Sequence, residues 1–91
     1  MVSREVKITN SIGLHARPAT FFVQKANCFR SVIKVEKDDR IVSAKSLLGI
    51  LSLGIAKGMT ITLRADGPDD AAAIDALAEL IDGGLDEMSR I

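Results

Sequence analysis

Apolar and polar residues alternate along four segments of the chain, with the period of a strand that has one buried face. In residues 3–9, Val6 and Ile8 fall on one side and charged residues on the other. The remaining segments are residues 31–37, 40–44 and 60–66. Only Asp38 and Asp39 separate the second segment from the third, so we expect these two strands to form a hairpin.

Two other segments carry apolar residues at the i, i+3, i+4, i+7 spacing of a helix face. The first runs from Ala16 to about Asn27, and its apolar stripe comprises Ala19, Phe22, Val23 and Ala26. The second starts at Asp69 or Asp70, one of which we expect to cap it, and ends at Gly83–Gly84. Its stripe comprises Ile74, Leu77, Ala78 and Ile81.

The apolar stretch after Ser46, LLGILSLG, fits a short helix or a buried strand by periodicity alone. Serine is a favoured N-cap residue, which favours the helix. The predicted order is then βαββαβα. We therefore predict an α+β fold, a two-layer open-faced sandwich in which a four-stranded antiparallel sheet is covered on one face by three helices. Residues 1–91 are expected to form a single domain.

Composition narrows the function further. The longest uncharged run, residues 46–56, is far shorter than the ~20 residues that span a bilayer, so no membrane span is expected. The N-terminal residues lack the apolar core of a secretion signal, and we expect a cytoplasmic protein.

Cys28 has no second cysteine to pair with and is interpreted as structural. No residue set has metal-ligand spacing, and no cofactor is expected.

The net charge of zero hides an uneven distribution along the chain. Residues 1–64 hold 11 Lys and Arg against 4 Asp and Glu, whereas residues 65–91 hold 1 against 8. A basic face would steer toward an acidic protein surface or an anionic small molecule. The only aromatic residues are 3 phenylalanines, without the aromatic-basic strip that stacks single-stranded bases, so nucleic acid is not an expected partner.

The only histidine, His15, stands in NSIGLHARPAT just before the first predicted helix. Pro18 supports a helix start, because proline is tolerated in the first turn. The unpaired N–H groups and the helix dipole form an anion site there, and Arg17 adds a guanidinium that can grip two phosphate oxygens. The same positive field disfavours the imidazolium and keeps a neutral nucleophile available. Such a ring can accept a phosphoryl group, although a simple cap or anion contact remains open.

GLHARPA at residues 13–19 and KSLLGILSLG at residues 45–54 together closely resemble the HPr family, the histidine-containing phosphocarriers of the bacterial phosphoenolpyruvate:sugar phosphotransferase system. The resemblance covers nearly the whole chain. It implies that His15 accepts a phosphoryl group on Nδ1 from Enzyme I and passes it to sugar-specific IIA domains, while Arg17 holds the phosphate. Such a carrier is a substrate of its partners rather than a stand-alone catalyst, and we expect a monomer.

The resemblance also implies a partner-docking surface on the first two helices. Its residues would be Thr20, Phe21, Leu47, Leu48 and Leu51. Two layers cannot bury every side chain of so apolar a second helix, so part of that helix should stay exposed. We expect Ile50 and Leu53 to pack inward.

Ser46 has two possible roles. As an N-cap it needs only to accept a backbone hydrogen bond. In Firmicute-type members of the family the corresponding serine is phosphorylated by HPr kinase/phosphorylase. This phosphorylation weakens Enzyme I docking and promotes binding to a catabolite-control repressor. The added charge of about −1.5 to −2 would oppose an apolar interface beside Leu47 and Leu48. Serine also occurs here in members from organisms without that kinase, so the regulatory role stays open.

Two other functions also remain open. A purely regulatory binding protein of the same fold would be like the Crh paralogues, which keep the serine but lack the histidine; His15 argues against it. A metabolite-binding or RNA-binding module would use His15 and Arg17 only as anion contacts.

The sequence departs from the family pattern at three positions. Ile12 stands where a small polar residue is common, and Leu48 and Leu51 replace the methionines usual in Firmicute members. None of these departures touches the phosphorylation chemistry.

Overall fold

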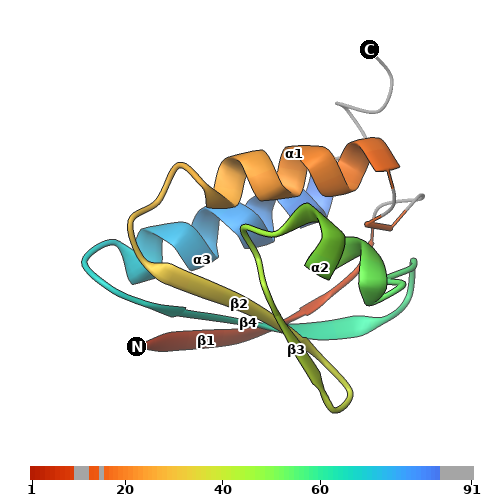
Figure 1. Cartoon of the computed structure of the whole chain (residues 1–91), viewed down its shortest axis with the longest axis horizontal. Coiled ribbons are helices and arrows are strands. Elements are labelled where there is room, and N and C mark those ends of the chain that lie inside the picture. The colour runs from red at the N-terminus through yellow and green to blue at the C-terminus, as the bar shows by residue number, and fades with distance from the viewer. Residues whose placement is uncertain (10–12, 15, 85–91) are drawn as a thin grey trace.

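The computed structural model describes residues 1–9, 13–14 and 16–84 and shows a two-layer sandwich (Figure 1). Its described strands form one antiparallel sheet in the order β1-β4-β2-β3. Their bounds are β1 Val2–Lys7, β2 Val32–Lys37, β3 Arg40–Ser43 and β4 Thr60–Asp66. The helices α1 (Ala16–Ala26), α2 (Leu47–Ser52) and α3 (Asp70–Glu79) all lie on one face of this sheet. The predicted fold class and element order are confirmed.

The alternation of apolar residues explains the sheet, since one side of each strand packs under the helices. Val6 lies opposite Ile61 in the β1–β4 pair, and Val35 lies opposite Leu63 in the β2–β4 pair. All four side chains are buried. The first strand is shorter than predicted, because its last apolar residue, Ile8, bonds to a turn instead of a strand: its N–H donates to the Met59 carbonyl at 2.8 Å.

The hairpin between β2 and β3 is confirmed at the predicted turn. Lys37 lies opposite Arg40, and Asp38 adopts a positive φ of 55°, a conformation that aspartate tolerates in turns. The strand β3 ends at Ser43, one residue earlier than expected. The next residue, Ala44, still donates its N–H to the Ile33 carbonyl at 2.9 Å, so the chain leaves the sheet gradually toward α2.

The helices differ from the prediction in two details. In α1, Ala19, Phe22 and Ala26 are fully buried, but Val23 is only partly buried, so the buried stripe is narrower than expected. The last helix does not run on to the glycines as an α-helix; it ends at Glu79 and continues as a π-helix, η1 (Leu80–Gly84). The spacing of apolar residues does not reveal the change from α-helix to π-helix. Leu80 and Ile81 are buried in the wider π-helical turn, as apolar residues of an α-helix would be.

The prediction that an aspartate side chain caps α3 is wrong for Asp69. This residue occupies the N-cap position, but its side chain makes no capping hydrogen bond. Its carboxylate instead accepts the backbone N–H groups of Arg30 and Ser31, each at 2.9 Å. The donors at the start of β2 therefore take the oxygens that a cap would use. Asp70 bonds locally, with Oδ1 accepting the Ala71 N–H at 2.7 Å.

Candidate functional site

The segment that leads to α1 is held against the turn that follows α2. Leu14 is fully buried, and its N–H donates to the Ile55 carbonyl at 3.0 Å. Gly13 has a φ of +73°, and a Cβ placed there would lie only 2.5 Å from the Ile55 oxygen. Only glycine permits so close a backbone approach. The backbone at residues 13 and 14 is therefore held close to Ile55.

His15 and Ile12 lie outside the described residues. The helix α1 begins at Ala16, the next residue in the sequence, as the pattern predicted. Arg17 is exposed in the first turn, followed by a buried Pro18. No acidic residue stands in that turn, so no side chain of the turn itself neutralises the positive end of the helix dipole. The first turn of α1 can therefore attract an anion, with Arg17 as an additional cation.

The second predicted site element, α2, has only six residues and depends on tertiary contacts for its position. At its N-terminus the Ser46 Oγ accepts the Gly49 N–H at 3.1 Å, which confirms the predicted N-cap. At its C-terminal end two cations from the β2–β3 hairpin donate to carbonyls: Arg40 to Ser52 at 2.7 Å and Lys37 to Leu53 at 2.8 Å. Sequence reasoning missed these hairpin contacts, because nothing in the local pattern links residues that far apart.

The apolar stretch of α2 divides into an inner and an outer face, as predicted. Ile50 and Leu53 are buried. Leu48 is 81% exposed, and Leu47 and Leu51 are each 38% exposed. Three leucines on a six-residue helix thus form an exposed apolar surface at the end of the molecule where α1 and α2 are in contact. We call Leu47, Leu48 and Leu51 the leucine face.

The α1 residues of the predicted docking surface are less exposed than the leucine face. Thr20 and Phe21 are half-buried. Phe21 lines a hollow of about 220 Å³ over α1 and η1, together with Cys28 and Leu80. Its side chain thus contributes to the surface next to η1, whereas the leucine face belongs to α2. Cys28 is exposed, and its Sγ donates to the Gln24 carbonyl at 3.4 Å.

The described Cys, Asp and Glu residues include no group of three or more that could hold a metal ion. None of the described helices has the length and apolar composition that crossing a bilayer requires.

Comparison with known proteins identifies the family of the chain. Residues 2–83 match the family model of the PTS HPr component phosphorylation site. The chain belongs to the HPr family. It is 48% identical over 82 residues to the HPr-like protein Crh of Halalkalibacterium halodurans, which covers 90% of this chain and 98% of that protein. It is 42% identical over 87 residues to the phosphocarrier protein HPr of Neisseria meningitidis, covering 96% and 98% respectively.

Solved HPr-family structures agree with the fold. The crystal structure of HPr-C-His from Thermoanaerobacter tengcongensis superposes with a TM-score of 0.90 at 48% identity, covering 93% of this chain and 96% of that one. The Crh protein of Bacillus subtilis, 43% identical with a TM-score of 0.72 and coverage of 90% and 94%, is an intertwined dimer formed by domain swapping. Dimers thus occur in the HPr family, which weighs against the expectation of a monomer.

Proposed function

We propose that the chain is a phosphocarrier of the bacterial phosphoenolpyruvate:sugar phosphotransferase system, in which His15 accepts a phosphoryl group from phospho-Enzyme I and passes it to sugar-specific IIA domains. One observation carries the proposal: the only histidine of an HPr-family chain directly precedes the first turn of α1, which contains Arg17 and no acidic residue. We further propose that residues 1–91 act as one domain in the cytoplasm.

The proposed transfer needs a neutral imidazole as the nucleophile. Nδ1 of His15 forms a bond to phosphorus while the bond between phosphorus and the donor breaks, and the phosphoryl group leaves by the reverse process on an acceptor. The positive end of α1 and the Arg17 guanidinium stabilise the oxygens of the transferred group. Protonated imidazole would lack the attacking lone pair, so the same positive field also favours the reactive form.

We propose that Ser46 regulates docking when it is phosphorylated by HPr kinase/phosphorylase. Its Oγ lies at the N-terminus of α2, where a phosphate is electrostatically tolerated. The added charge of about −1.5 to −2 would stand next to the leucine face and oppose its burial against Enzyme I. The modified surface would then suit a different partner, such as a catabolite-control repressor.

A second candidate function is favoured by the 48% identity to a Crh protein. In that case the chain would be a regulatory binding protein that acts through Ser46 phosphorylation alone. His15 argues against this alternative, because a purely regulatory protein has no use for a nucleophile at the start of α1.

The deciding experiment is incubation with phosphoenolpyruvate and an active bacterial Enzyme I, followed by intact mass before and after mild acid. We expect one acid-labile phosphate, which His15→Ala abolishes and Ser46→Ala leaves unchanged. No gain in mass, with an Enzyme I that phosphorylates an authentic HPr in the same tube, would overturn the carrier role and favour the regulatory one. A parallel reaction with ATP and HPr kinase/phosphorylase should add an acid-stable phosphate that Ser46→Ala abolishes.

A further inference from the structure

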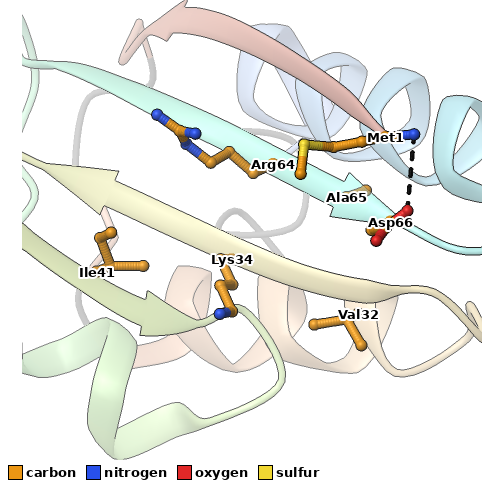
Figure 2. Close-up of a pocket in the computed structure, with 7 residues that line it drawn as sticks. All are labelled: Met1, Val32, Lys34, Ile41, Arg64, Ala65 and Asp66. Atoms are coloured by element: carbon orange, nitrogen blue, oxygen red, sulfur yellow. Dashed lines mark ion pairs between the residues drawn. The ribbon is translucent and has the colours of Figure 1, made fainter.

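The face of the sheet opposite the helices carries an exposed apolar area at one side only. Along β1 and the first half of β4 the outward residues are polar, as expected for a solvated sheet face: Ser3, Glu5, Lys7, Thr60 and Thr62. On the other side Val32 of β2 is 61% exposed and Ile41 of β3 is 55% exposed. Between them lies a hollow of about 340 Å³ (Figure 2). Its lining consists of Met1, Val32, Lys34, Ile41, Arg64, Ala65 and Asp66.

The same hollow contains a cation whose charge is not compensated. Lys34 lies directly opposite Arg64 in the β2–β4 pair, and like charges at such positions repel. Arg64 is neutralised by Glu36, whose Oε2 lies 3.0 Å from the guanidinium. Within the described residues the Lys34 ammonium has neither an ion pair nor a hydrogen bond. The hollow therefore offers one positive charge to a partner from outside.

The sheet register sets the order of these groups. Lys34 follows Val32 by two residues on the same face of β2, a step of about 6.6–6.8 Å. The next outward position on β2 is Glu36, and Ile41 lies opposite it on the neighbouring strand β3. The three groups Val32, Lys34 and Ile41 therefore run obliquely from β2 to β3 in the order apolar, cationic, apolar. An extended segment that crosses from β2 to β3, with an aliphatic, an acidic and an aliphatic residue at alternate positions, matches this order and the charge of Lys34.

We propose that this face docks an extended segment of a partner protein in which one carboxylate stands between two aliphatic side chains, each two residues away. The carboxylate pairs with Lys34, and the aliphatic side chains cover Val32 and Ile41. One carboxylate suffices, because Glu36 already balances Arg64. This surface lies on the side of the sheet away from α2, so such a partner would leave the leucine face accessible (Figure 1). The inference goes beyond phosphoryl transfer and does not depend on it.

The test uses the peptide acetyl-Val-Thr-Glu-Thr-Ile-amide and a control peptide with Gln in place of Glu. Each is titrated into the ¹⁵N-labelled full chain while backbone amide shifts are followed by NMR. We expect saturable shifts at Val32, Lys34 and Ile41, with the Glu peptide binding about threefold to fivefold more tightly, as for an exposed ion pair. Lys34→Gln should abolish this difference. Lys7→Gln, which removes another exposed cation from the polar part of the same face, should preserve it.

Three results would overturn the proposal: no saturable shifts, equal binding of both peptides to the unaltered chain, or shifts confined to the leucine face. Because His15 takes no part, the titration can be repeated with His15→Ala. Failure of the docking proposal and failure of the phosphocarrier proposal are therefore separate results.

Discussion

The hydroxyl of Ser31 donates to the carboxylate of Asp69, and this contact joins the start of β2 to the start of α3. Ser31 is almost completely buried, and a Cβ on the neighbouring Gly67 would lie 2.6 Å from its Oγ. The pKa of Asp69 lies below its ordinary value, first because of the Ser31 hydroxyl bond and then because of the Arg30 N–H bond. These donors stabilise the ionised carboxylate, so the junction is tightest when Asp69 is charged.

The first prediction concerns the pH dependence of stability. Because the pKa of Asp69 is lower in the folded state than its ordinary value of 3.8, its ionisation stabilises the fold above that pH. The contribution is lost as the pH falls through the lowered pKa of the folded state. We expect Asp69→Asn to reduce the urea midpoint clearly at about pH 6 and less at about pH 2, because the contribution of the ionised carboxylate in the wild type declines below pH 3.8.

Asp75→Asn provides the matched control. Asp75 pairs with Arg4 at 3.3 Å, but both side chains are exposed, and such surface pairs contribute little. Its urea midpoint should stay near that of the wild type at both pH values. A loss in Asp69→Asn that is equally large at both pH values would contradict the role of the ionised carboxylate.

The same junction shows where prediction from the sequence stops. The alternation of apolar residues in β4 and the apolar stripe in α3 were sufficient to predict the two layers of the fold. The side of a strand or helix that becomes buried follows from the spacing of its own apolar residues. The partner of Asp69 was not predictable, because Arg30 and Ser31 lie 39 and 38 residues away in the sequence. The predicted cap was wrong because tertiary donors compete with local ones.

The candidate site shows a similar division. The N-cap of α2 follows from the preference of serine for this position. The burial of Ile50 and the exposure of Leu48 follow from the helical period. The hydrogen bond from Arg40 to the Ser52 carbonyl depends on where the β2–β3 hairpin lies relative to α2. The spacing of apolar residues does not predict that position. The proposed role of His15 rests on the GLHARPA motif and on the family resemblance, because this residue lies outside the described residues.

The second prediction concerns the close approach of Gly13 to Ile55. Alanine at position 13 must tolerate a positive φ and also displace the Ile55 carbonyl. We expect Gly13→Ala to lower the free energy of unfolding by about 2 kcal/mol or more. Gly54 has a similar φ of +60° with nothing within 4 Å of the added Cβ. Gly54→Ala should therefore cost only about 1 kcal/mol. Equal losses in urea unfolding would show that the contact with Ile55 does not matter.

The third prediction concerns the N-cap of α2. Ser46→Ala removes the oxygen that accepts the Gly49 N–H, so the free energy of unfolding should fall by about 1 kcal/mol. Ser46→Asp keeps an acceptor and adds a negative charge at the positive end of the helix, so its stability should stay near that of the wild type. Chemical denaturation of the three proteins checks this order. If Ser46→Asp were as unstable as Ser46→Ala, capping would not be the stabilising role of this residue.

The fourth prediction separates docking from folding and rests on the proposed function. Leu48 is 81% exposed, so Leu48→Ser should change the free energy of unfolding by less than about 0.5 kcal/mol. In phosphoryl transfer from Enzyme I it should raise KM about fivefold or more while leaving kcat nearly unchanged, because an exposed leucine becomes buried only when the partner docks. Ile41→Ser is the matched control: it removes an exposed aliphatic side chain from the face of the sheet that the helices do not cover, and it should leave both constants unchanged. A fall in kcat with KM unchanged, or equal effects of the two substitutions, would contradict a docking role for the leucine face.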